Sequence, residues 1–134
     1  MTAATATRDA RRSRSPGRKC CHRLAWAIEA AASAPFNSLL ANLYRDGRDT
    51  VGWHRDNERG LRPQDTIASL SLGNARDFKV RRVGAGGDTW TLPLGHGDLL
   101  LMRAGSQTDF EHTVPRRAQS GERVNLTFRW FEPA

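Results

Sequence analysis

Cysteines and long apolar segments are scarce in this sequence. The chain has only two cysteines, and these, Cys20 and Cys21, are adjacent. Adjacent cysteines close no long loop and lack the spacing of a four-ligand zinc site, which excludes a disulfide-stabilised scaffold and fits a reducing compartment. No apolar run approaches the roughly 18 residues that a membrane-spanning helix needs. We therefore expect a protein with no membrane partner.

The formal net charge is +7, which at first suggests a nucleic-acid binder, but this charge is unevenly distributed. Residues 1–23 carry seven Lys or Arg against Asp9 alone, whereas from Leu24 onward 14 basic residues nearly balance 13 acidic ones. The excess of positive charge therefore belongs to the N-terminal segment and not to the surface of the folded part. Charge alone is weak evidence for a nucleic-acid partner.

A length of 134 residues with 38% hydrophobic content is typical of one compact domain with a modest core and room for one site. Residues 1–22 are polar, basic and nearly devoid of large apolar side chains, so they are predicted to be a disordered leader, and residues 23–134 to be the folded domain. An Arg-, Ser- and Ala-rich leader is also typical of an organellar transit peptide or of a misassigned start. The sequence does not separate these alternatives.

The folded part is predicted to be mainly β. Residues 24–32 have the alanine content of a helix, which Pro35 would end. Beyond it, short apolar or alternating segments are separated by Gly, Pro and Asp, at 37–44, 67–72, 77–83, 88–93, 98–102 and 123–131. This spacing favours a β-sandwich or jelly roll behind one N-terminal helix. The glycine-rich stretches 84–87 and 95–98 are predicted to be turns.

A His-x-Asp triplet offers two metal ligands within three residues. In an extended chain residues i and i+2 face the same side, so His54 and Asp56 project together. His112 lies 58 residues further on and would join them if the fold brings the strands together. Two imidazoles and one carboxylate on one face of a metal leave positions open for a co-substrate and dioxygen, as in non-haem Fe(II) oxygenases. The trio therefore predicts iron-dependent oxygen chemistry.

The same residues also permit an ordinary interpretation. Asp56 could lie in a surface turn and pair with Arg55 or Arg59, and four histidines in one chain make chance pairs common. The two other histidines, His22 and His96, fall in the predicted leader and in a predicted turn. We assign no role to them.

The segment 123–131 alternates cleanly between polar and apolar residues, and its polar face consists of Arg123, Asn125, Thr127 and Arg129. By pattern alone this is a half-buried strand that shows its polar face to water. If that face lies inside a barrel instead, its two guanidiniums would need an anion. A dicarboxylate such as 2-oxoglutarate would meet this need, because arginine pairs bidentately with carboxylate. Asn42 and Tyr44 repeat the i, i+2 arrangement and would add an amide and a phenol to the same ligand.

Short motifs follow one another over most of the chain: FN at 36–37, NLY at 42–44, GWHRDNE at 52–58, IASLSLG at 67–73, RDF at 76–78, GDLLLM at 97–102, His112 with Pro115, and RVNLTFR at 123–129. In these motifs the chain resembles the AlkB-like Fe(II)/2-oxoglutarate-dependent dioxygenases, which repair alkylated nucleic acids. The resemblance implies a double-stranded β-helix with His54, Asp56 and His112 as the iron ligands.

The resemblance also implies how the co-substrate is held. Arg123, with Tyr44 and Asn125, would hold the distal carboxylate of 2-oxoglutarate, while Asn42 and Arg129 would lie near its metal-bound end. Fe(II) would be the cofactor, with 2-oxoglutarate and O2 as co-substrates. The implied reaction oxidises a methyl group on a base nitrogen, as in 1-methyladenine or 3-methylcytosine, and releases formaldehyde, succinate and CO2.

The implied partners are alkylated single- or double-stranded DNA or RNA, and a base inside a duplex would have to be flipped out. Glu58 matches an acidic position that contacts the damaged base, although a surface charge paired with Arg62 is the alternative. Trp53 could stack on a base or lie in the core, and Arg76 could contact phosphate or lie on a solvated strand face. We expect a monomer in the cytoplasm, associated with the nucleoid, or in the nucleus of a eukaryote.

Members of this family normally carry a longer segment ahead of the catalytic strands, which supplies a lid over the nucleotide. Residues 1–35 do not match that segment, so the domain is expected to lack the lid. Two other functions stay open on the sequence. One is a 2-oxoglutarate oxygenase that acts on a protein or a small molecule. The other is a truncated, non-catalytic remnant whose basic leader binds nucleic acid by charge, with strong salt dependence.

Overall fold

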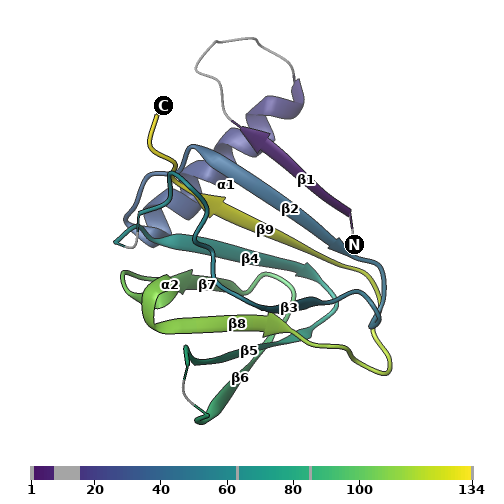
Figure 1. Ribbon diagram of the computed structural model, residues 1–134. Coiled ribbons are helices and arrows are strands. Elements are labelled where there is room, and N and C mark those ends of the chain that lie inside the picture. The colour runs from purple at the N-terminus through teal and green to yellow at the C-terminus, as the bar shows by residue number, and fades with distance from the viewer. Residues whose placement is uncertain (1, 8–15, 63, 85, 134) are drawn as a thin grey trace.

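Two antiparallel sheets lie face to face, with one long helix across the outer side of the larger sheet (Figure 1). The computed structural model describes residues 2–7, 16–62, 64–84 and 86–133, with side chains from His22 onward. The elements are β1 Thr2–Thr7, α1 Pro16–Ala32, β2 Ser38–Tyr44, β3 Val51–His54, β4 Ile67–Gly73, β5 Arg76–Arg82, β6 Thr89–Leu94, β7 Leu99–Met102, α2 Ser106–Asp109, β8 Phe110–Val114 and β9 Arg123–Arg129.

The larger sheet has the strand order β1-β2-β9-β4-β7 and the smaller sheet has the order β3-β8-β5-β6. Strands that are distant in the sequence are therefore neighbours in each sheet, as in a jelly roll. The turn between β6 and β7 carries the chain from the smaller sheet to the larger one, and the Asp98 carboxylate accepts the Gly95 N–H at 2.8 Å there. The predicted mainly β jelly roll is confirmed.

The helix α1 is longer than the predicted 24–32, because it begins at Pro16 and spans 17 residues. Proline suits the first turn of a helix, where its missing N–H has no partner to lose. Thr2–Thr7 forms β1 and pairs with β2, whereas this segment was predicted to be part of a disordered leader. Residues 8–15, which hold much of the basic charge of that leader, lie outside the described residues. In the described part of the chain, no helix has the length and apolar composition to cross a membrane.

The outer core lies between α1 and the larger sheet. Ile28 and Ala32 of α1 are buried against Ala68 and Leu70 of β4 and Phe128 of β9. Phe128 also packs on Phe36, with 6.0 Å between the ring centroids. Since successive side chains of a strand point to opposite faces, the residues between these apolar ones must point the other way, toward the smaller sheet.

The inner face of the larger sheet is therefore polar at its centre. Arg123, Asn125, Thr127 and Arg129 are all buried. The register places Tyr44 of β2 opposite Arg123 and Asn42 opposite Asn125. Beside them, an inner apolar cluster joins Tyr44 to Phe78, Leu94 and Val114. The water-facing interpretation of β9 is thus excluded, and its polar face lies inside the barrel.

The packing of α1 can be tested with two substitutions on the same helix. Ile28 is 5% exposed and Trp26 is 73% exposed. We expect Ile28→Ala to lower the free energy of unfolding by about 2 to 5 kcal/mol, because it removes a buried side chain and leaves a cavity. Trp26→Ala should change it by less than about 0.5 kcal/mol. Urea denaturation followed by circular dichroism measures both, and equal effects would contradict the described packing.

Candidate metal centre

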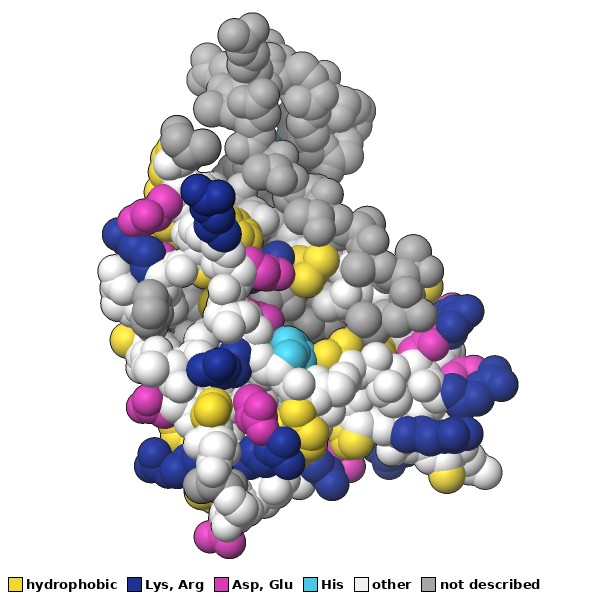
Figure 2. All heavy atoms as spheres, in the orientation of Figure 1, with side chains coloured by type: hydrophobic (Ala, Val, Ile, Leu, Met, Phe, Trp, Pro, Cys, Tyr) yellow, Lys and Arg dark blue, Asp and Glu magenta, His cyan; other side chains and the backbone are white. Residues whose placement is uncertain are grey.

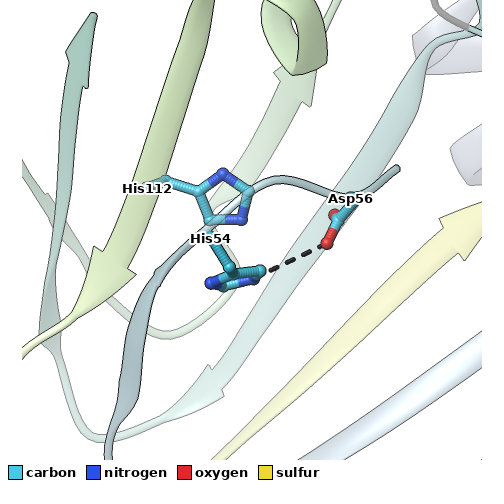
Figure 3. Close-up of side chains that lie close together, drawn as sticks. All are labelled: His54, Asp56 and His112. Carbon is cyan, nitrogen blue, oxygen red and sulfur yellow. Dashed lines mark ion pairs between the residues drawn. The ribbon is translucent and has the colours of Figure 1, made fainter. Parts of the chain in front are cut away.

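His54, Asp56 and His112 point toward one another on the inner face of the smaller sheet (Figure 3). His54 ends β3 and lies directly opposite His112 of β8, while Asp56 follows in the loop after β3. One potential ligand atom from each residue lies within 4.8 Å of the others. The His54 Nε2 and Asp56 Oδ1 atoms are 3.6 Å apart. The structure thus brings together the trio that the sequence predicted, although its two histidines lie on β3 and β8, two strands that were not predicted.

Neighbouring groups fix the orientation of this trio. The Nδ1 atom of His54 lies 2.7 Å from the carbonyl oxygen of Gly52, so Nδ1 carries the hydrogen and Nε2 keeps its lone pair. The backbone N–H of Asp56 donates to Oε1 of Gln107 at 2.8 Å. The ring of His112 stacks on Phe78 with 4.9 Å between centroids. Gln107 gave no signal in the sequence, because it follows Asp56 by 51 residues and belongs to no motif.

Burial shifts the pKa of two members of the trio. It lowers the pKa of His112 to about 4, with a smaller contribution from the nearby His54. At neutral pH His112 is therefore uncharged, as a metal-ligating imidazole must be. Burial raises the pKa of Asp56, while His54 and Arg129 act in the opposite direction. A divalent cation at this position would supply the counter-charge that favours the carboxylate.

Next to the trio, the polar face of β9 presents two buried guanidiniums. Arg123 is 2% exposed and Arg129 is 3% exposed. Arg123 donates through Nη2 to the Ser71 hydroxyl at 2.9 Å, but its Nε and Nη1 atoms, and Nε of Arg129, have no partner among the described residues. Burial lowers the pKa of Arg123, because the cation loses its hydration. Unpaired donors on buried cations fit an anionic ligand.

The amide of Asn125 is fixed by small polar neighbours. Its Nδ2 donates to the Ser69 hydroxyl at 2.7 Å and to the Leu70 carbonyl at 3.2 Å, and its Oδ1 accepts from the Thr127 hydroxyl at 3.0 Å. Ser69 and Ser71 were not singled out in the sequence, because small polar residues within an apolar strand carry no pattern of their own. They reach Asn125 and Arg123 only because β4 pairs with β9.

The three residues expected to bind substrate lie in different surroundings. Glu58 is exposed and pairs with Arg129, not with Arg62, whose partners are Asp65 and Glu132. Trp53 points to the outer face of the smaller sheet, where the Arg81 guanidinium lies over its ring at 4.0 Å.

Arg76 is 1% exposed and donates to backbone carbonyls. Trp53 is therefore not placed to stack on a base at the metal trio, and Arg76 is not placed to contact a phosphate. The first faces away from the metal trio, and the second shows nothing to solvent.

The model of one protein family, described as the 2OG-Fe(II) oxygenase superfamily, matches residues 3–129. The chain belongs to this superfamily. Membership implies Fe(II) as the metal and 2-oxoglutarate as the co-substrate, and the nitrogen, nitrogen and oxygen donors of the trio suit Fe(II).

Among curated proteins, the chain is 44% identical over 115 residues to Alpha-ketoglutarate-dependent dioxygenase alkB homolog 3 of Mus musculus, covering 79% of this chain and 40% of that protein. It is 41% identical over 110 residues to DNA oxidative demethylase ALKBH2 of Homo sapiens, covering 76% of this chain and 42% of that protein. These relatives confirm the AlkB-like resemblance. The chain spans about two fifths of their length.

A solved structure, "The structure of OsALKBH1", superposes with a TM-score of 0.63 at 21% identity and covers 84% of this chain and 63% of that one. This likeness concerns the fold alone.

The trio predicts a clear result for metal binding. We expect His112→Ala to weaken the binding of Co(II), used as an air-stable substitute for Fe(II), by more than about 100-fold, because losing a ligand should cost more than losing a residue that only orients one. His96→Ala is the matched control, since His96 is exposed and its Nδ1 accepts the Gly73 N–H. Equilibrium dialysis with metal analysis measures both. Unchanged binding by His112→Ala would rule out this metal centre.

Proposed function

We propose that the chain is an Fe(II)/2-oxoglutarate-dependent dioxygenase that demethylates N-alkylated bases, such as 1-methyladenine and 3-methylcytosine, in DNA or RNA. One observation carries the chemistry: the His-Asp-His trio lies beside a buried strand face with unpaired guanidinium donors. The name of the relative DNA oxidative demethylase ALKBH2 supports the class of substrate. The products would be formaldehyde, succinate, CO2 and the restored base.

In this proposal His54, Asp56 and His112 hold Fe(II). The Gly52 carbonyl keeps the Nε2 lone pair of His54 available, and Gln107 holds the backbone of Asp56 in place. Bound there with 2-oxoglutarate and O2, the iron would supply the oxidation of the methyl group. The protein's own contribution is to hold the reactants in position.

Arg123 would bind the distal carboxylate of 2-oxoglutarate through its free Nε and Nη1 atoms, and Tyr44, whose ring lies beside the guanidinium, would contribute its hydroxyl. Asn125 would line the same pocket. Its amide is held in place there by hydrogen bonds to the Ser69 and Thr127 hydroxyls. Arg129 would lie near the metal-bound end through its free Nε, with the half-buried Asn42 on the neighbouring strand. Charge-assisted bonds of this kind are roughly twice as strong as neutral ones.

Glu58 would contact the base. Its side chain is 55% exposed, and its carboxylate is held by the buried Arg129 next to the trio. An ionised carboxylate in this position can accept a hydrogen bond from the exocyclic amino group of adenine or cytosine. Basic side chains gather over the smaller sheet, beside a histidine that reaches the surface (Figure 2). We propose Lys79, Arg81 and Arg82 of β5 as the residues that would meet the phosphates.

We propose that the enzyme acts as a monomer, because the trio and both arginines come from one chain. A nucleic-acid substrate would place it with the nucleoid, or in the nucleus of a eukaryote. Both single- and double-stranded substrates are included, with flipping required for the latter.

The proposal is tested by measuring formaldehyde and succinate release. The full chain is incubated with Fe(II), 2-oxoglutarate and a single-stranded oligonucleotide that carries 1-methyladenine or 3-methylcytosine. Release should require the methyl group, should be abolished by Asp56→Ala, and should be unchanged in Asp88→Ala, which removes an exposed acid.

Succinate release that ignores the methylated base would favour an oxygenase with a protein or small-molecule substrate. Binding of the oligonucleotide without turnover, lost at high salt and retained in Asp56→Ala, would favour a non-catalytic remnant.

A second expectation concerns the co-substrate. Arg123→Gln should raise KM for 2-oxoglutarate by about 10- to 100-fold, because a hydrogen bond to a charged group is lost. Its KM for the oligonucleotide should stay near the wild-type value. Arg117→Gln is the control, since the Arg117 side chain is exposed and, among the described residues, donates to the Ala75 carbonyl at 3.4 Å. A KM for 2-oxoglutarate that is the same in Arg123→Gln as in the wild type would remove Arg123 from the pocket.

A further inference from the structure

Arg76 is a buried cation that the proposed function does not use. It opens β5, and its guanidinium donates to the carbonyl oxygens of Asp46 at 3.0 Å and Asp49 at 2.9 Å, in the loop between β2 and β3. It also donates to the carbonyl of Pro115, just after β8, at 2.7 Å. Among the described residues no carboxylate pairs with it. Carbonyl dipoles hold this guanidinium in place, but they do not neutralise its charge.

The Tyr44 ring lies close to two guanidiniums. The central carbon of the Arg76 guanidinium is 5.5 Å from the ring centroid, and that of Arg123 is 5.2 Å from it. Tyr44 ends β2 and is 3% exposed. Contacts between a guanidinium and an aromatic face are attractive, and more so away from water. The ring thus lies against two fixed guanidiniums, and both help to set its position.

The two cations also share one region without a carboxylate partner in the described structure. The proximity of Arg76 acts with burial to lower the pKa of Arg123. Two guanidiniums in a buried, low-dielectric region repel each other unless an anion lies near them. The far end of the proposed co-substrate pocket therefore carries more positive charge than Arg123 alone would supply.

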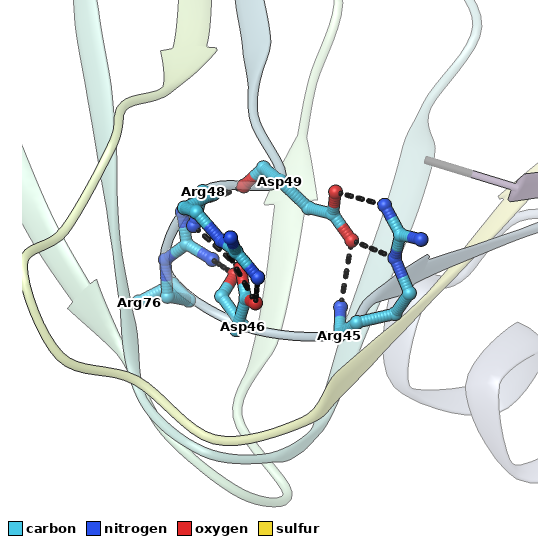
Figure 4. Close-up of polar contacts among 5 residues, drawn as sticks. All are labelled: Arg45, Asp46, Arg48, Asp49 and Arg76. Carbon is cyan, nitrogen blue, oxygen red and sulfur yellow. Dashed lines mark hydrogen bonds and ion pairs between the residues drawn. The ribbon is translucent and has the colours of Figure 1, made fainter.

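Anchoring of the loop does not by itself account for a charged residue at this position. The loop has its own links, since the Asp49 carboxylate accepts from Arg45 and the Asp46 carboxylate accepts from Arg48 (Figure 4). The Gly47 carbonyl also accepts the Arg117 N–H at 2.9 Å. Arg76 adds a positive charge on a rigid, planar guanidinium that lies against Tyr44.

We propose that Arg76 is a positioning residue of the co-substrate pocket: it holds Tyr44 beside Arg123 and adds a second fixed positive charge, so that the pocket selects keto acids with a distal carboxylate. The inference rests on the proposed function, in which Tyr44 and Arg123 bind that carboxylate. Arg76 itself contacts backbone carbonyls and the Tyr44 ring. It therefore acts on the co-substrate through Tyr44 and through the electrostatic field of its positive charge.

Two keto acids separate this role from a purely structural one. 2-Oxoglutarate and 2-oxopentanoate have the same carbon chain, but only the first has a distal carboxylate. Their dissociation constants are measured by calorimetry on the Mn(II)-loaded full chain, which allows binding without turnover. The wild type should prefer 2-oxoglutarate, and Arg76→Gln should reduce that preference at least about tenfold by weakening 2-oxoglutarate only. Arg103→Gln, which removes an arginine that donates to the Ala32 carbonyl at 2.7 Å, should leave the preference unchanged.

Arg76→Lys keeps the positive charge but loses the planar guanidinium with its several N–H donors. Circular dichroism checks that both variants are folded. If Arg76→Gln does not fold, Arg76→Lys decides the question. Its preference for 2-oxoglutarate over 2-oxopentanoate should fall between that of the wild type and that of Tyr44→Phe, which lacks the hydroxyl. Equal weakening of both keto acids, or a full wild-type preference in a folded Arg76 variant, would overturn the inference and leave the proposed function intact. Failure of the wild type to bind 2-oxoglutarate would instead overturn the proposed function.

Discussion

The burial of charged groups on the inner face of β9 is the constraint on which the site depends. The interior of this small protein holds Arg123 and Arg129 where an ordinary sandwich would hold apolar side chains. Burying a cation is costly unless other groups replace its lost hydration. Ser71, Glu58 and the Tyr44 ring meet part of that need, and the unpaired guanidinium donors mark the part that is left. The surrounding strands therefore form a receptor for an anion as well as a core.

Much of this arrangement followed from the sequence, because periodicity and spacing carry it. The alternation in 123–129 correctly separated the two faces of β9, and the i, i+2 spacing correctly placed His54 and Asp56 on one side. Periodicity alone does not say which face is inside, and by pattern the polar face of β9 belonged in water. The chemistry of arginine offered the alternative, in which the two arginines are buried and bind an anion, and the structure confirms their burial.

Other features could not be predicted, for physical reasons. The strands β3 and β8 are short, and their sequences VGWH and FEHTV lack the continuous apolar run that marks the equally short β7, although they carry both histidines of the trio. The outward turn of Trp53 follows from the inward turn of His54, but only once β3 is known to be a strand. Both sequence interpretations of Arg76, a phosphate contact or a solvated strand face, place it at the surface, where arginines usually lie. Its burial depends on carbonyl oxygens from two distant segments, which no local pattern records.

The position of β3 at the edge of the smaller sheet links metal chemistry to the mechanics of the fold. Among the described residues β3 pairs with β8 alone, and the register between the two strands is irregular between Val51 and His54. A metal ion held by His54 and His112 would clamp this edge strand to the strand beside it. Part of the free energy of metal binding would then stabilise the pairing of β3 with β8, because metal binding commonly couples to folding. Loss of the metal should loosen β3 first, while the helix-covered sheet stays closed.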